Sequence, residues 1–167
     1  MSPPLPDKST KKEHIRFLQQ AIDIANTNVH TGIGGPYGAL IVHNGNIIAY
    51  SGNCVTSSLD PTAHAEISAI RKACQSLQNF HLPDCILYSS CEPCPMCLGA
   101  IYWARIRQVF YACSRFDASA AGFDDLFIYQ EIAKHPEQRS IPMHHIHLPN
   151  ALSPFISWQN KEDKTPY

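Results

Sequence analysis

Three potential metal ligands stand at the starts of two predicted helices. His64 opens one helix in the segment His64-Ala65-Glu66, and Cys94 and Cys97 open another in the segment Pro93-Cys94-Pro95-Met96-Cys97. One imidazole and two thiolates are ligands that Zn²⁺ prefers, and three protein ligands leave the fourth tetrahedral position for water. Because helix N-termini favour the thiolate form of cysteine, this pattern predicts a zinc site with one open position.

Glu66 lies two residues after His64 at the opening of the same predicted helix. At this spacing its carboxyl group is close enough to hydrogen-bond a water molecule on the metal without binding the metal itself. A carboxyl group in that place can serve as general acid and base beside the nucleophile. The four residues together therefore predict a catalytic zinc site.

The spacing alone leaves other uses of the cysteines open. Cys91 could join His64, Cys94 and Cys97 and complete a closed, structural zinc site. The three cysteines also resemble the start of a bacterial iron–sulfur run, but Ile101 stands where the fourth cysteine belongs, which disfavours a cluster. A last alternative treats the cysteines as small buried apolar residues. We expect this of Cys54, Cys74, Cys85 and Cys113.

Length and charge narrow the class of protein. A chain of 167 residues with 44% hydrophobic residues predicts one soluble globular domain that can bury a core without disulfides. Lys and Arg number 13 against 14 Asp and Glu, so there is no basic excess for a phosphate backbone and no nucleic-acid partner is expected. The sequence shows neither a secretory signal pattern nor an apolar run of roughly 20 residues, which predicts a cytoplasmic protein away from membranes.

Hydrophobic periodicity predicts alternating helices and strands. After a flexible lead-in over residues 1–8, a helix begins beyond a Ser9 or Thr10 cap. Asn44-Gly45 predicts a hairpin because both turn residues must adopt positive φ. Asp60-Pro61 predicts the start of a second helix, with Asp60 as its cap and Pro61 at the first helical position. The expected buried face of the first helix is Ile15, Leu18, Ile22, Ala25 and Val29.

Further along the chain, strands are predicted at 85–88 and 109–112, with a helix between them that continues from the cysteine motif. Residues 123–134 and 154–161 are predicted helices, and residues 144–148 a possible edge strand. The alternation of strands and helices favours a sheet with helices packed on its faces.

Two motifs resemble the cytidine deaminase superfamily. They are Asp60-Pro61-Thr62-Ala63-His64-Ala65-Glu66 and Ser90-Cys91-Glu92-Pro93-Cys94-Pro95-Met96-Cys97. The combination of H-x-E with P-C-x-x-C is typical of zinc-dependent nucleobase deaminases. A narrower resemblance to the bacterial-type guanine deaminases rests on weaker segments and covers nearly the whole chain from about residue 12. These segments are Gly34-Gly35-Pro36-Tyr37-Gly38-Ala39, Ala100-Ile101-Tyr102-Trp103-Ala104-Arg105, Ala121-Gly122-Phe123-Asp124-Asp125 and the closing Tyr167.

The resemblance implies a three-layer α/β/α sandwich with a five-stranded mixed sheet, formed by a single domain over residues 1–167. It also implies one Zn²⁺ per subunit and a homodimer. In that dimer the C-terminal segment, about residues 150–167, would be exchanged between subunits, so that Tyr167 of one chain closes the pocket of the other. A polar tail that ends in an aromatic residue agrees with this expectation.

The activity that the resemblance implies is hydrolytic deamination of guanine to xanthine and ammonia, with a small purine as substrate. His64, Cys94 and Cys97 would bind the metal, and Glu66 and Asp125 would be catalytic. Substrate contacts would come from Asn53, Tyr37, Trp103, Ala65 and Tyr167.

Several of these roles have structural alternatives. Tyr37 departs from the phenylalanine typical of its motif, although both rings can stack on a base. Trp103 could be a core residue on a helix face, Asn53 a turn residue, and Asp125 a helix cap that follows Asp124.

The motifs leave other substrates and another class of protein open. The alternatives to guanine are cytosine, adenosine in transfer RNA and ammeline, and the alternative to an enzyme is a non-catalytic zinc domain. His144, His145 and His147 suggest a second metal site only faintly, and a solvated strand face is the simpler interpretation.

Overall fold

The computed structural model describes residues 10–123 and 125–167. The chain divides into an N-terminal unit, Met1–Leu126, and a C-terminal unit, Phe127–Tyr167. The predicted lead-in at 1–8, the alternative cap Ser9, and Asp124 lie outside the described residues. None of the helices in the described part combines the length and the apolar character that a membrane crossing needs.

A mixed sheet of four strands forms the centre of the N-terminal unit, in the order β2-β1-β3-β4. β1 (Gly38–His43) pairs antiparallel with β2 (Asn46–Gly52) and with β3 (Cys85–Cys91), whereas β3 pairs in parallel with β4 (Gln108–Cys113). Asn44 and Gly45 join β1 to β2 with φ of 50° and 77°. The predicted hairpin is therefore confirmed.

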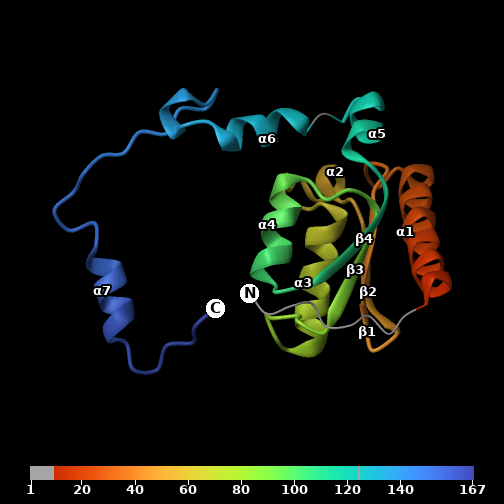
Figure 1. The fold of residues 1–167 in the computed structure, drawn as a ribbon, viewed down its shortest axis with the longest axis horizontal. Helices are drawn as coiled ribbons and strands as arrows, with labels where there is room; N and C mark the ends of the chain where they lie inside the picture. Colours follow the sequence, from red (N-terminus) through yellow and green to blue (C-terminus); the bar gives the residue numbers. More distant parts are fainter. Residues whose placement is uncertain (1–9, 124) are drawn as a thin grey trace. The chain divides into compact units, whose positions relative to one another are not determined.

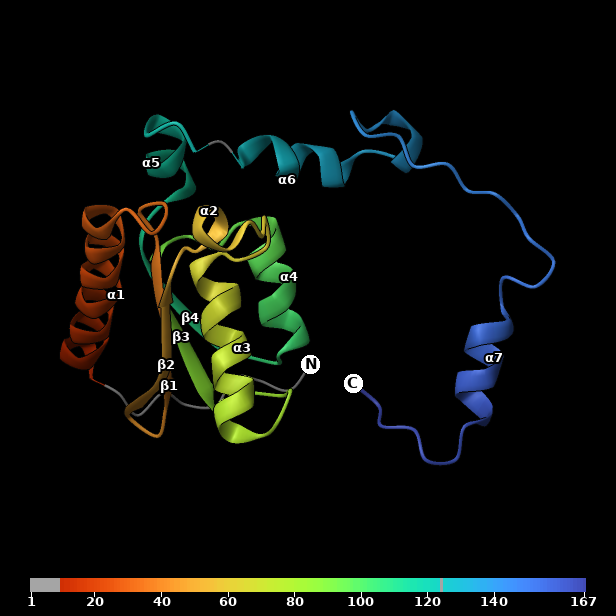
Figure 2. The same cartoon turned by 180° about the vertical axis from the view of Figure 1, so that it is seen from behind.

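Helices cover both faces of this sheet, which gives three layers (Figures 1 and 2). α1 (Lys11–Thr31) lies on one face and is capped by Thr10, which forms a capping box with Glu13. Its buried residues are Phe17, Ala21, Ala25 and Asn28. Of the predicted face, Ala25 is confirmed and Leu18 packs partly buried against the core, whereas the prediction was wrong for Ile15 and Val29. Ile15 and Val29 are 58% and 51% exposed, because Phe17 rather than Ile15 packs against Tyr88 of β3.

α3 (Ala65–Leu77) and α4 (Pro95–Trp103) cover the opposite face (Figure 2). α3 begins later than predicted, with His64 rather than Asp60 as its N-cap. The Asp60 carboxylate accepts hydrogen bonds from the Thr62 N–H at 2.8 Å and the Thr62 hydroxyl at 2.7 Å, which closes a turn ahead of the helix. The short helix α2 (Val55–Ser58) precedes this turn.

The fifth strand is a correction to the predicted fold. Residues 144–148 form no strand, and Ile146 in their middle is 76% exposed. A strand needs a neighbour for its backbone N–H and C=O groups, and no strand in the described residues pairs with this segment. The sheet of the described chain therefore has four strands, not five.

The described part of the last third of the chain contains short helices joined by non-helical segments. α5 (Arg115–Ala120) follows β4, and the predicted helix at 123–134 is found as α6 (Leu126–Ala133). The 3₁₀ helix η1 (Pro136–Gln138) comes next. The helix predicted at 154–161 is found as α7 (Ser153–Asn160).

Candidate metal centre and active site

The predicted metal ligands converge at the N-terminal ends of α3 and α4. His64 is the N-cap of α3, and Cys94 is the N-cap of α4, where Pro95 supplies the first helical residue. The sulfur atoms of Cys94 and Cys97 each lie 3.5 Å from Nδ1 of His64. The ligand atoms of all three residues lie within 4.8 Å of one another.

The chemistry of this donor set fits zinc. Hydrogen bonds from the Cys97 side chain and from His64 lower the pKa of the Cys94 thiol. The hydrogen bond between His64 and Cys94 raises the pKa of the His64 imidazole. Two sulfurs with one imidazole nitrogen form the set that Zn²⁺ prefers.

Cys91 does not belong to this group. Among the described residues the potential ligand group contains His64, Cys94 and Cys97, while the Cys91 sulfur donates to the carbonyl oxygen of Ser114 at 3.5 Å. The closed four-ligand site that Cys91 would complete is therefore not formed. His145 and His147, with ring centroids 6.5 Å apart, belong to no ligand group within the described chain.

Glu66 reaches the metal group from the second residue of α3. Its side chain is only 5% exposed. One carboxyl oxygen accepts a hydrogen bond from Ser89 at 3.2 Å, and the other lies 3.5 Å from the sulfur of Cys97. Burial raises the pKa of Glu66, since the charged form loses hydration. A buried carboxyl group therefore lies beside the ligands without being one of them.

A cavity of about 380 Å³ opens onto this centre. Its volume lies in the range of small-molecule sites. Six of the predicted site residues line it together: Tyr37, Asn53, His64, Glu66, Cys94 and Asp125.

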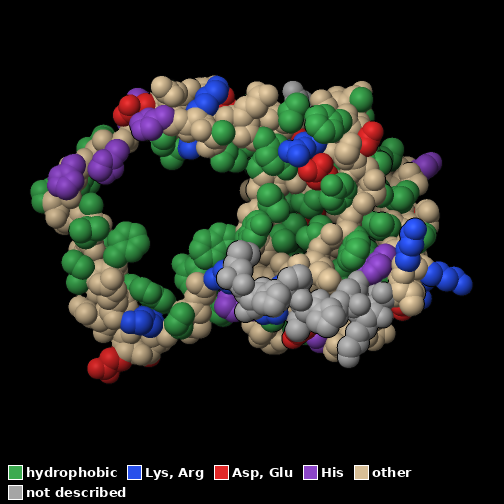
Figure 3. All heavy atoms as spheres, viewed as in Figure 1, with side chains coloured by type: hydrophobic (Ala, Val, Ile, Leu, Met, Phe, Trp, Pro, Cys, Tyr) green, Lys and Arg blue, Asp and Glu red, His purple; other side chains and the backbone are tan. Residues whose placement is uncertain are grey.

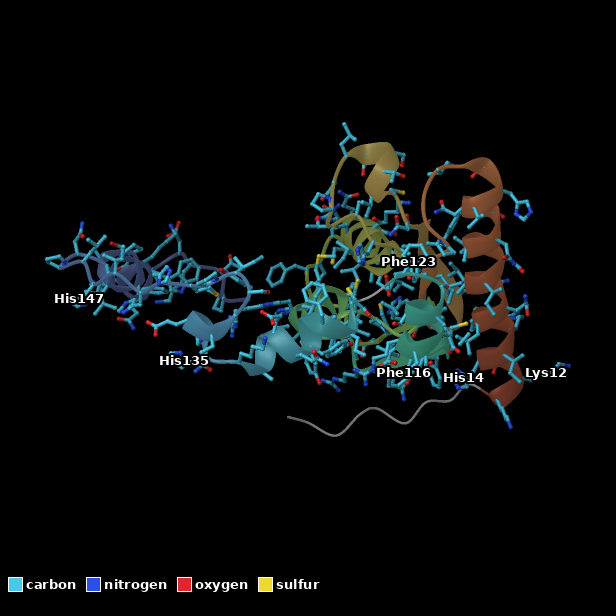
Figure 4. The ribbon with its side chains drawn as sticks, turned by 90° about the horizontal axis from the view of Figure 1, so that it is seen from above. Lys12, His14, Phe116, Phe123, His135 and His147 are labelled. Carbon is cyan, nitrogen blue, oxygen red and sulfur yellow. The ribbon has the colours of Figure 1, made fainter. Side chains whose placement is uncertain are left out.

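Two aromatic rings form part of the cavity wall. Tyr37 and Phe123 meet edge to face at a centroid distance of 5.2 Å, and Figure 4 labels Phe123 at the end of the α5 segment. Burial raises the pKa of the Tyr37 hydroxyl, and the nearby Cys91 and Asp125 side chains raise it further. Tyr37 therefore keeps its proton at neutral pH.

The structure does not bring every predicted residue to the cavity. Trp103, the last residue of α4, is 62% exposed, and Ala65 is fully buried as the first residue of α3. Neither is among the described residues that line the cavity. Tyr167 belongs to the C-terminal unit, where its ring lies 6.4 Å from that of Trp158.

Asn28 holds the loops that carry Tyr37 and Asn53. Its side-chain amide donates to the carbonyl oxygens of Gly35 at 2.8 Å and Asn53 at 2.9 Å. The two loops pack without room for a side chain, because a Cβ on Gly34 would lie 2.1 Å from the Asn53 oxygen. A Cβ on Gly52 would lie 2.4 Å from the amide oxygen of Asn28.

Sequence reasoning missed several residues of this site. Asn28 and Ser89 act through hydrogen bonds across the fold, and no local motif marks them. Glu92 and Arg115 also line the cavity and form an ion pair at 3.4 Å. Glu92 could have been predicted as a site residue from its position inside the cysteine motif, whereas no sequence feature marks Arg115.

The three-layer fold and this ligand group define a class of α/β proteins that bind zinc where two helices begin. The family model for the cytidine and deoxycytidylate deaminase zinc-binding region matches residues 11–113. The chain belongs to this cytidine and deoxycytidylate deaminase family.

Its relatives within the family include proteins of two named activities. A guanine deaminase from Bacillus subtilis is 58% identical over 92% of this chain and 99% of its own length. The X-ray structure of the B. subtilis guanine deaminase covers 92% of this chain and 98% of that chain with a TM-score of 0.91. A tRNA-specific adenosine deaminase from Agrobacterium fabrum is 50% identical over 46% of this chain and 50% of its own length.

A second solved structure holds a purine. It is a complex with 2,6-diaminopurine and is 32% identical to this chain. It covers 65% of this chain and 61% of that chain, with a TM-score of 0.63.

Proposed function

We propose that this protein hydrolyses guanine to xanthine and ammonia. The observation that carries the proposal is the His64, Cys94 and Cys97 ligand group with the buried Glu66 beside it, at the floor of a small cavity. The 58% identity to a guanine deaminase over 92% of the chain supports guanine as the substrate.

His64, Cys94 and Cys97 would hold the zinc ion. When bound, zinc supplies a Lewis acid that lowers the pKa of water toward 7. Glu66 accepts a proton from the attacking water and delivers it to a ring nitrogen of guanine. It then helps to transfer the second proton of that water to the departing amino group, which leaves as ammonia, so that guanine and water yield xanthine and ammonia. General acid and base catalysis of this kind typically contributes about 10² to 10⁴ in rate.

Asn53, Tyr37 and Asp125 would orient the base. The side-chain oxygen of Asn53 accepts the Val55 N–H at 3.2 Å, and this contact supports an amide NH₂ that points to a purine acceptor. The Tyr37 ring supplies a stacking surface. Asp125, which also lines the cavity, would accept a hydrogen bond from the amino group that is lost and assist the proton transfer to it.

The remaining substrate contacts and the dimer belong to the same proposal. The segment at about 150–167 is exchanged between two subunits, and Tyr167 of one closes the cavity of the other, beside Trp103 and the backbone of Ala65. Apolar side chains along the C-terminal unit support the exchange (Figure 3), among them Leu152 and Phe155, each 67% exposed.

A substrate panel tests the reaction. Ammonia release is measured from guanine, adenine, cytosine and ammeline, and xanthine is identified as the second product. A site that hydrogen-bonds one base edge rejects analogues by 10⁴ or more, so we expect guanine to dominate. Turnover of cytosine or ammeline above that of guanine would refute guanine as the substrate.

A further inference from the structure

Ser89 breaks the apolar pattern on one face of β3. Side chains of a strand alternate between the two faces of its sheet. Cys85 and Leu87 point into the core beneath α3 and α4, and Ser89 follows them on that face with 1% of its surface exposed. A hydroxyl group at a core position costs free energy unless it is hydrogen-bonded, so its partner explains its presence.

That partner is the carboxyl group of Glu66. The Ser89 hydroxyl donates to Oε1 of Glu66 at 3.2 Å, while Oε2 lies on the side of the Cys97 sulfur at 3.5 Å. The two carboxyl oxygens thus have different neighbours. Because the final torsion of a glutamate side chain is broad, a hydrogen bond to one oxygen fixes the direction of the other.

We propose that Ser89 is a positioning residue for Glu66, since its hydroxyl directs Oε2 of that carboxyl toward the metal group. The inference rests on the proposed function, in which Glu66 moves the protons. Ser89 is not among the described residues that line the cavity, so its effect on the substrate passes through Glu66. Proton transfer depends on geometry held within fractions of an ångström.

Ser90 supplies a matched control on the same strand. Its side chain points to the opposite face, where it accepts a hydrogen bond from the Gly38 N–H at 3.0 Å. Ser89→Ala and Ser90→Ala each remove one buried hydroxyl, from neighbouring positions. Only Ser89→Ala removes the hydrogen bond to the Glu66 carboxyl.

The experiment compares kcat and KM for guanine in the zinc-loaded enzyme and its variants. Because the hydrogen bond that orients the Glu66 carboxyl is lost, we expect Ser89→Ala to lower kcat about tenfold or more, with KM within about twofold. We expect Ser90→Ala to lower the melting temperature while kcat stays within about twofold.

A second pair of variants separates the hydroxyl from packing. Thr and Val have nearly the same shape, but only Thr carries the hydroxyl. Ser89→Thr should therefore retain far more kcat than Ser89→Val, at equal zinc content. Equal activity of these two variants, or a Ser89→Ala enzyme with wild-type kcat, would overturn the inference. A rise in KM without a fall in kcat would overturn it as well.

Crystal structures of the Ser89→Ala and Ser89→Thr variants give a readout without turnover. We expect the Glu66 carboxyl to rotate in the first and to keep its direction in the second. An unchanged carboxyl in Ser89→Ala contradicts the inference even if guanine is the substrate. A wild-type protein without activity on guanine refutes the proposed function, and the carboxyl direction still decides the role of Ser89.

Discussion

A substitution at Glu66 can remove proton transfer without removing the zinc ligands. Glu66 lies beside the ligand group, and a glutamine at this position keeps the shape of the side chain and an acceptor for Ser89. Glutamine cannot take up a proton from water, so Glu66→Gln should lower kcat by about 10² to 10⁴ while zinc stays bound. Ammonia release and the zinc content of the purified protein check this together. Full turnover by this variant would remove Glu66 from the mechanism.

Cys94 and Cys91 should differ in their effect on zinc binding. Cys94 belongs to the ligand group, whereas the Cys91 sulfur faces the Ser114 carbonyl oxygen. Cys94→Ser should lose zinc on dialysis against a chelator, and Cys91→Ser should retain about one zinc per chain because none of its ligands is changed. Equal loss from both variants would support a closed structural site, and the assignment as an enzyme would then fail.

The ligands could be predicted from the sequence because each stands in a short motif at a helix start. Ser89 and Asn28 could not, since each acts on a residue more than 20 positions away. The one sequence feature that marks Ser89 is its place as a polar residue on an otherwise apolar face of β3, and this feature does not identify its partner. Asn28 lies on the buried face of α1, whereas the face predicted from the periodicity of the apolar residues did not include it.

At the scale of elements, Asn28 connects α1 to the two loops of the cavity wall. Asn28→Ala leaves the carbonyl oxygens of Gly35 and Asn53 without this donor, which should cost about 1–3 kcal/mol of stability. The loops that hold Tyr37 and Asn53 should shift, so KM should rise several-fold. Urea unfolding and steady-state kinetics measure the two effects. Asn26→Ala, at an exposed position of the same helix, is the control and should change neither.

Local chemistry decided which elements were predictable. The Asn44-Gly45 turn requires only its own two residues, and both adopt the expected positive φ. The start of α3 was displaced because the Asp60 carboxylate bonds Thr62 in a turn, an alternative equally open to a capping residue. The strand expected at 144–148 depended on a neighbour that no local pattern specifies.

The whole molecule consists of a folded N-terminal unit and a C-terminal unit whose helices bury no residue. Large apolar side chains in the C-terminal unit, such as Phe155 and Ile156, are more than half exposed. Burial of such surface is the main source of stability in folded and assembled proteins. This exposure is the physical reason for the proposal that a second chain covers these side chains.

Subunit mixing tests the exchanged dimer. The Glu66→Gln protein lacks the proton carrier, and a Tyr167→Ala protein lacks the closing aromatic ring, so each homodimer should be impaired at both sites. If Tyr167 acts on the partner's cavity, a heterodimer of the two variants contains one site with both residues intact. Random refolding of an equal mixture makes about half of the dimers mixed, so about a quarter of all sites should regain wild-type turnover. Should Tyr167 act within its own chain, the mixture would show only the average of the two variants.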